Sequence, residues 1–316
     1  MREFDLDFPQ RTDLADESTE YIRLCSGKSD TGLCTREETL NGFSVHTLEV
    51  LDERGEAASG KPTGTYITVD VGKIWNSDKQ RFRSACSALA QCVRSFIPPK
   101  TQSCLLAALG NRAIIADAIG PITAENFIVT RHIRQSDPDL FDSLLMRETV
   151  CICPGVLGST GIEAAEIIRG AVSCARPDLV IAVDSLASRR LSRLATTVQI
   201  CNTGIAPGSG IYNARKELTA RTLGVPVIAV GVPTVVEVTT LAAELLRSAA
   251  EKTGNLGKKE IHDILDSLSE QDGEGFFVTP KETDHIIKDT AKLIGYGLNL
   301  ALHDSLSFDE IDEFLS

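Results

Sequence analysis

Four short segments of this chain are apolar at nearly every position, and they constrain its fold more than any other feature. They are SCLLAALG (103–110), TVCICPG (149–155), DLVIAVD (178–184) and VPVIAVG (225–231). A strand with one face in water alternates apolar and polar residues, whereas a strand covered on both faces is apolar throughout. These segments are therefore predicted to be buried strands of one sheet, and ATTVQI (195–200) is a further candidate strand.

Segments with apolar residues at helical spacing separate and follow these strands. Strands joined through helices of this length lie parallel, and the helices then cover both faces of the sheet. We therefore expect an α/β fold with three layers, α/β/α, in which a mostly parallel, twisted central sheet is followed by extra C-terminal helices. The predicted helices span 78–97, 122–133, 161–175, 213–224, 232–252, 258–270 and 280–303.

The first part of the chain has a different pattern. FSVHTLEVL (43–51) and TGTYITVDV (63–71) alternate apolar and polar residues and are separated by a polar stretch, which predicts an N-terminal hairpin. Residues 1–38 are polar and acid-rich without a sustained period, so we expect an extended or loosely attached segment there. No internal repeat or low-complexity linker divides the chain.

Composition limits the classes of protein and of partner. The 316 residues are 42% hydrophobic and carry a formal net charge of −12. The hydrophobic share is typical of a globular protein, and the negative charge opposes binding to nucleic acid or to an anionic membrane. No apolar run approaches the roughly 20 residues of a membrane span. The acid-rich start lacks the features of a signal peptide. We expect a cytoplasmic protein whose nine cysteines are mostly buried thiols.

Residues with useful chemistry follow the predicted strands. Open parallel sheets bind ligands outside the carboxyl ends of their strands. Asn111 and Asp117 come after the first apolar strand, and Asp184 ends the third. Either aspartate could simply cap a helix. If the two carboxyl groups meet instead, one keeps its proton, and the pair can activate water and protonate a leaving amine, which is the chemistry of peptide hydrolysis.

Other chemistries have weaker support in the sequence. The glycine-rich loops that follow 149–153 and 195–200 permit close backbone approach, but neither matches a phosphate-binding motif. His132 with Asp184 and Glu163 could form a metal site, although no fixed spacing supports one. The chain has no G-x-S-x-G elbow of a serine hydrolase. A nucleoside- or phosphate-binding module stays open as an alternative to an enzyme.

A series of longer motifs runs in one order along nearly the whole chain. In these motifs the chain resembles the germination proteases of spore-forming bacteria, which degrade small acid-soluble spore proteins during germination. That family is similar in core fold to the hydrogenase-maturation endopeptidases. The motifs are RTDLA, LGN followed by DAIGP, VTRH, PGVLGSTGIE, LVIAVDSLASR, VQICNTGIAPGSG, RKELT, LGVPVIAVGVPTVV, VTPKE and GLNLALH.

The resemblance implies an endopeptidase of an atypical aspartic type in which Asp117 and Asp184 are catalytic. It also implies cleavage after Glu or Asp and before an apolar residue, a homotetramer, and a location in the cytoplasm of the forespore or spore core. No metal or other cofactor is expected, and no direct contact with nucleic acid or membrane. The residues expected to orient the peptide are Asn111 and the loop glycines Gly155, Gly158, Gly204 and Gly208.

Members of this family are made as zymogens that remove their own N-terminal segment. Asp13-Leu14-Ala15 matches the acid, apolar residue and alanine at which the family cuts. The resemblance therefore implies that Asp13–Leu14 is the processing bond, with 1–13 as a propeptide and 14–316 as a single catalytic α/β domain. An endopeptidase of the hydrogenase-maturation type, which clips one partner protein and could use a metal ion, remains an alternative.

Overall fold

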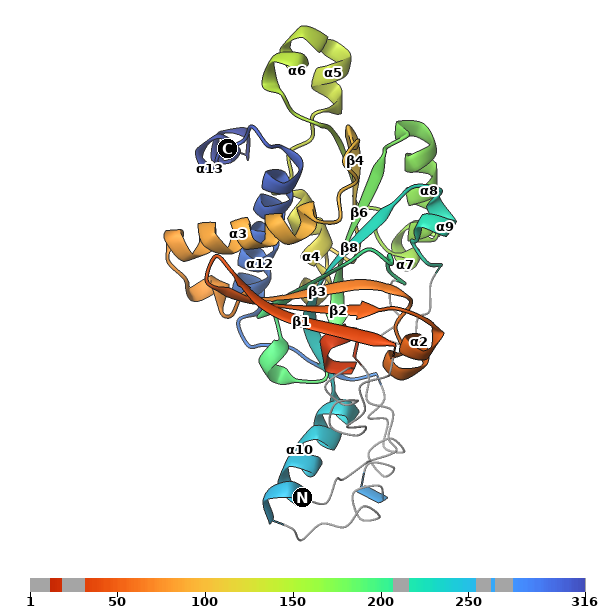
Figure 1. The fold of residues 1–316 in the computed structure, drawn as a ribbon, viewed down its shortest axis with the longest axis vertical. Coiled ribbons are helices and arrows are strands. Elements are labelled where there is room, and N and C mark those ends of the chain that lie inside the picture. Colours follow the sequence, from red (N-terminus) through yellow and green to blue (C-terminus); the bar gives the residue numbers. More distant parts are fainter. Residues whose placement is uncertain (1–11, 19–31, 207–215, 254–262, 265–274, 316) are drawn as a thin grey trace.

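One mixed sheet organises the chain. The computed structural model describes residues 12–18, 32–206, 216–253, 263–264 and 275–315 (Figure 1). Within these residues nine strands pair in the order β1-β2-β3-β7-β8-β6-β4-β5, with β9 paired to β8. The strands are β1 (Leu33–Leu40), β2 (Phe43–Val50), β3 (Gly64–Asp70), β4 (Ser103–Ala108), β5 (Glu148–Ile152), β6 (Leu179–Ala187), β7 (Thr197–Cys201), β8 (Val227–Glu237) and β9 (Phe277–Val278).

Helices cover both faces of the sheet (Figure 1). On one face, Cys104 and Leu106 of β4 join an apolar cluster with α3, α4 and α12. On the other face, Leu105 and Ala107 join a cluster with α8. The helices are α2 (Glu53–Ser59), α3 (Lys79–Arg94), α4 (Ile119–Ala124), α5 (Arg131–Ser136), α6 (Pro138–Leu144), α7 (Leu157–Thr160), α8 (Ala164–Ala175), α9 (Ala220–Leu223), α10 (Val238–Thr253), α12 (Thr283–Leu302) and α13 (Phe308–Leu315).

The predicted α/β fold with three layers is confirmed. The four apolar segments form the parallel core of the sheet, in which β6 pairs with β4 and with β8, and β4 pairs with β5. An antiparallel part made of β1, β2, β3 and β7 extends the sheet beyond β8. The predicted hairpin is the β2–β3 pair, with α2 in its connection. Among the described helices, none has the length and apolar character that crossing a membrane requires.

The expectation of a loose segment up to residue 38 is wrong for its last part. Residues 33–40 form β1, which pairs along its whole length with β2. The turn between them is Asn41-Gly42, with φ of 51° and 86°. Two-residue hairpin turns of this kind need positive φ at both positions, and Asn-Gly is the pair that adopts it most readily. Residues 1–11 and 19–31 of the predicted segment lie outside the described residues.

The single helix predicted over 122–133 is two helices, α4 and α5. Between them the backbone bonds to other elements instead of continuing a helix. Ile128 N–H donates to Asn299 Oδ1 of α12, at 3.0 Å. Thr130 N–H donates to Thr149 Oγ1 of β5, at 3.1 Å. Tertiary hydrogen bonds thus outweigh the local helical pattern.

Two further predicted helices have different boundaries in the structure. The helix expected to begin at residue 232 begins at Val238, because the β-branched run up to Glu237 continues β8. The helix expected over 213–224 spans only Ala220–Leu223 among the residues described there. The helix predicted over 258–270 lies outside the described residues except for 263–264.

The buried middle of the sheet should dominate stability. Leu106 of β4 is fully buried, so we expect Leu106→Ala to lower the free energy of unfolding by about 2–5 kcal/mol. Leu145→Ala is the matched control, since Leu145 is 78% exposed and its truncation should change the free energy by less than about 0.5 kcal/mol. Urea unfolding followed by circular dichroism measures both. Similar losses for the two variants would contradict this account of the core.

Candidate active site

A cavity of about 790 Å³ lies along the carboxyl ends of β4, β6 and β8. Its lining includes both predicted catalytic aspartates, Asp117 and Asp184. The cavity wall also includes Lys61 and Tyr66 from the segment around β3, and Gln199 of β7. The fold therefore brings the two carboxylates to one hollow, at the sheet edge where sites of this architecture are expected.

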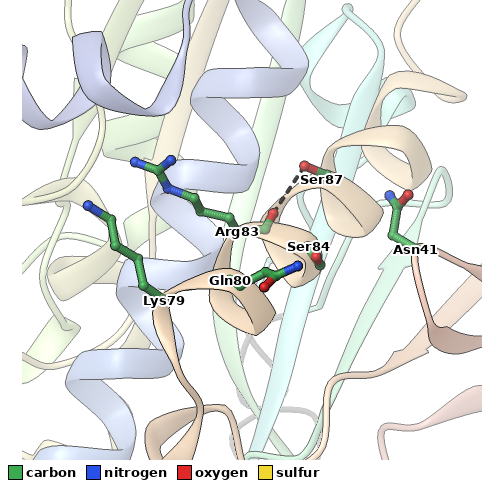
Figure 2. A pocket seen from close by; sticks show the side chains of 6 residues that line it. All are labelled: Asn41, Lys79, Gln80, Arg83, Ser84 and Ser87. Atoms are coloured by element: carbon green, nitrogen blue, oxygen red, sulfur yellow. Dashed lines mark hydrogen bonds between the residues drawn. The ribbon is translucent and has the colours of Figure 1, made fainter.

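A second hollow, of about 440 Å³, shares no lining residue with the first. It is open and lies over α3, where the Ser87 hydroxyl bonds to the backbone of Arg83 (Figure 2). No carboxylate is among its lining residues, which are Asn41, Lys79, Gln80, Arg83, Ser84 and Ser87 (Figure 2). Of these two hollows, only the one at the strand ends carries paired acids.

Asp117 is held by the loop that follows β4. The Asn111 N–H lies 3.0 Å from Asp117 Oδ2 and 2.8 Å from its backbone oxygen. Gly110 has a φ of 112°, and a Cβ there would lie 2.1 Å from the Asp117 oxygen, so this loop needs a glycine. The helix-cap interpretation of Asp117 is wrong, because α4 is preceded by Ala118 and has no side-chain cap.

Asp184 lies within a strand rather than at its end. Strand β6 continues to Ala187, and Asp184 sits opposite Gly231 of β8. The side chain is 6% exposed, and its Oδ1 accepts a hydrogen bond from the Ser185 N–H at 2.9 Å. The next helical element after Asp184 is a short turn at Leu191–Arg193, seven residues further on. Asp184 therefore caps no helix, and the helix-cap interpretation is wrong here too.

The residues predicted to orient a peptide are only partly brought together. Gly155 and Gly204 line the cavity. Gly204 has a φ of 83°, and a Cβ there would lie 2.1 Å from the Leu218 oxygen. Asn111 acts on Asp117 through its backbone and is absent from the lining residues, as is Gly158 of α7. Gly208 lies outside the described residues.

The N-terminal segment enters the same cavity. We call residues 12–18 the docked segment. Asp13 lines the cavity, its N–H donates to the Ala187 oxygen, and its Oδ2 accepts from the Ala187 N–H, each at 2.9 Å. Leu14 is 0% exposed, and Ala15 packs in an apolar cluster with Leu48 and Tyr66. The bond predicted for processing thus adjoins the hollow that contains both aspartates.

Acidic residues after this bond are also bound. Glu17 is buried and accepts hydrogen bonds from the N–H groups of Arg189, at 2.8 Å, and Arg190, at 3.2 Å. Asp16 forms an ion pair with Arg193 at 3.0 Å. Burial raises the pKa of Glu17 above its ordinary value of 4.5, although the hydrogen bonds act in the opposite direction.

Two polar residues at the site were missed by sequence reasoning. Lys61 Nζ donates to the Asp13 carbonyl oxygen at 2.9 Å, and Gln199 Nε2 donates to the same oxygen at 3.2 Å. Burial lowers the pKa of Lys61, against the opposing effect of nearby acidic groups, chiefly Asp13. The available signal in the sequence was Gln199 itself, a polar amide between the apolar residues Val198 and Ile200. In the structure it is only 7% exposed.

The metal site considered for His132, Asp184 and Glu163 does not form a cluster. His132 lies on α5 and Glu163 precedes α8, and neither is among the cavity-lining residues that include Asp184. Across the described part of the chain, no three His, Cys, Asp or Glu side chains gather as a metal-binding group.

Known proteins similar to this chain point to one family. The germination protease family profile matches residues 12–252 and 243–315. The germination protease of Caldanaerobacter subterraneus is 41% identical, over 96% of this chain and 98% of that protein. The germination protease of Clostridium perfringens is 37% identical over 97% and 99%, and that of Bacillus velezensis 34% identical over 98% of each.

Among solved structures, the hydrogenase maturation protease HycI of Thermococcus kodakarensis aligns with a TM-score of 0.36 and 16% identity. The alignment covers 67% of this chain and 98% of that chain. The sequence matches, at 34–41% identity over nearly the full length, identify the class as a peptidase. The chain belongs to the germination protease family.

The buried Glu17 makes folding sensitive to pH. Because its pKa is raised in the folded chain, the folded state binds a proton that the unfolded state has lost. Its contribution to stability therefore falls as pH rises above 4.5, until the pKa of the folded state is passed. We expect the free energy of unfolding of the native chain to decline over this range relative to Glu17→Gln, as measured by urea unfolding at each pH. The exposed Glu49→Gln is the control, and a pH-independent difference for Glu17→Gln would contradict the prediction.

Proposed function

We propose that this protein is an endopeptidase that initiates the degradation of small acid-soluble spore proteins and uses Asp117 and Asp184 as its catalytic pair. The observation that carries the proposal is that Asp117, Asp184 and Asp13 all line one cavity. The proposed catalytic pair and the aspartate of a bond with the expected sequence thus line the same cavity. Family membership supports the peptidase, and the cavity supports the choice of residues.

The two carboxyl groups divide the work of hydrolysis. Two carboxyl groups that come close together do not both ionise cheaply, so in the proposed pair one would keep its proton while the other is charged. The charged carboxylate takes a proton from the attacking water, and the protonated acid supplies one to the leaving amine. The Asn111 N–H, which binds Asp117, holds one of the pair in place.

The docked segment supports the proposal of a self-processing zymogen. We propose that the chain cuts its own Asp13–Leu14 bond, with 1–13 as the propeptide and 14–316 as the catalytic domain. The same contacts support cleavage after acidic residues, because the Asp13 carboxylate is bound by the Ala187 N–H. We also propose a homotetramer in the cytoplasm of the forespore or spore core, as the resemblance implies.

The catalytic pair is tested by substituting each aspartate with its isosteric amide. Asp117→Asn and Asp184→Asn should each lower cleavage of a small acid-soluble spore protein by at least about 100-fold, because one proton-transfer group is lost. Self-processing should fail as well, while circular dichroism stays native. The control is Asp139→Asn on the exposed start of α6, which makes the same charge change. Normal cleavage by either active-site variant would refute the assignment. A metal-assisted mechanism is tested separately, by assaying the native chain with and without a strong chelator.

The zymogen is tested by removing residues 1–13. Because Asp13 occupies the cavity in the full chain, a chain that begins at Leu14 should cleave an added spore protein faster. Initial rates are compared for the shortened chain and for full-length Asp13→Ala, which retains the segment but lacks the acid that precedes the bond and should therefore stay uncut. Equal rates for these two chains would argue against a blocking role.

A further inference from the structure

One carbonyl oxygen in the cavity receives two side-chain donors. The oxygen of Asp13 accepts from Lys61 Nζ at 2.9 Å and from Gln199 Nε2 at 3.2 Å. Lys61 Nζ also approaches the Thr12 oxygen, at 3.4 Å. The Asp13 carbonyl is the one that belongs to the Asp13–Leu14 peptide bond, so both donors point at the atom that would become negative during hydrolysis of that bond.

The backbone around Lys61 is fixed. Helix α2 ends at Gly60 in the left-handed conformation, with φ of 66°, which turns the chain toward β3. The Lys61 N–H donates to Ser59 Oγ at 3.2 Å, and the Tyr66 hydroxyl donates to the Pro62 oxygen at 2.9 Å. These contacts hold a short loop on both sides of Lys61 and set the direction from which its side chain enters the cavity.

Gln199 is fixed by the sheet and by its own two contacts. It lies in β7, between Thr68 of β3 and Gly231 of β8. Its Oε1 accepts from the Ala15 N–H at 2.6 Å, while its Nε2 donates to the Asp13 oxygen. A backbone donor on one side and a backbone acceptor on the other leave a single orientation for the amide. Gln199 thus spans the Asp13–Leu14 bond.

We propose that Lys61 and Gln199 form the oxyanion site of this enzyme, binding the carbonyl oxygen of the scissile bond as it becomes negatively charged. The inference rests on the proposed function, which makes Asp13–Leu14 a substrate bond, and it adds two catalytic residues to the aspartate pair. The same donors would bind the carbonyl of the residue before the cut in any peptide substrate.

The proposed step balances as follows. The oxygen of a water molecule bonds to the Asp13 carbonyl carbon, one water proton passes to the ionised aspartate, and the C=O π electrons move to the oxygen held by Lys61 and Gln199. The carbonyl then re-forms, the carbon–nitrogen bond breaks, and its electron pair stays on the Leu14 nitrogen. That nitrogen takes a proton from the protonated carboxyl group. The products are a carboxylic acid at Asp13 and an amine at Leu14.

Anchoring of the segment does not by itself account for these donors. Asp13 is already held by both polar backbone groups of Ala187, and Glu17 by the N–H groups of Arg189 and Arg190. Withdrawing an ammonium group from water costs free energy, which nearby acidic groups, chiefly Asp13, offset only in part, and the neutral carbonyl adds little. A full negative charge on that oxygen compensates for more, so the interaction strengthens toward the transition state, as catalysis requires.

The test uses the full chain and a synthetic peptide with the sequence of residues 8–20. Self-processing of the full chain is followed as a first-order conversion. Peptide cleavage by chains that begin at Leu14, in which Asp13 no longer occupies the cavity, gives kcat and KM. Lys61→Met and Gln199→Met should each lower kcat by about 100-fold with a small change in KM, because an oxyanion donor acts on the transition state. Lys79→Met, on an exposed residue at the start of α3, is the matched lysine control and should cleave as the native chain does.

A residue that only holds the peptide affects KM, whereas an oxyanion donor affects kcat. Arg193→Met removes a contact to Asp16 and should raise KM rather than lower kcat. If Lys61→Met also changes KM alone, the inference is overturned. Lys61→Arg should recover part of kcat. Because burial lowers the pKa of Lys61 below 10.5, the alkaline fall in rate should shift to higher pH in this variant, whose charge persists.

The remaining outcomes separate the two proposals. If the native chain cuts neither itself nor the peptide after Asp13, the proposed function fails and this inference fails with it. If the native chain and Lys79→Met cut while Lys61→Met and Gln199→Met keep kcat within about 3-fold of native, the peptidase stands and the oxyanion site is overturned. If circular dichroism shows that Lys61→Met does not fold, kcat of Gln199→Met and of Lys61→Arg tests the oxyanion site instead.

Discussion

The unequal length of neighbouring parallel strands is the constraint on which the site depends. Strand β4 ends at Ala108, opposite Val183 of β6, whereas β6 continues to Ala187 beside β8. Residues 184–187 of β6 therefore have a strand partner on one edge and lack β4 on the other. The docked segment uses that edge, where Asp13 bonds to Ala187. The loop that leaves β4 turns away at Gly110 and carries Asp117 to the same place.

Burial patterns made much of this fold predictable, and long-range contacts set its limits. An apolar run such as 179–183 has few alternatives to a strand covered on both faces, so the parallel core followed from sequence. The break between α4 and α5 did not, because it depends on Asn299, which is far away in the chain. Strand β1 could have been recognised from Asn41-Gly42, a turn signal that is local and strong.

The candidate site divides in the same way. Asp117 and Asp184 could be chosen because strand ends and resemblance agree, and the structure adds their shared cavity. Lys61 and Gln199 could not, because a lysine in a loop and a glutamine in a strand have no spacing relative to Asp13 that a sequence displays. Their meeting is a product of the sheet order, which places β7 next to both β3 and β8. Gly158 was chosen from a glycine-rich motif, and it is not among the residues that line the cavity.

If the chain cuts the Asp13–Leu14 bond as proposed, the burial of Leu14 has a consequence. A residue with no exposed surface would then carry a newly formed positive amino terminus. Keeping an unpaired charge away from water costs several kcal/mol, roughly, in a protein interior. The new end would therefore pair with a carboxylate of the cavity or move out into water, and the severed chain would not return to its former arrangement. Hydrolysis would in this way drive the clearing of its own binding site and make activation a one-way event.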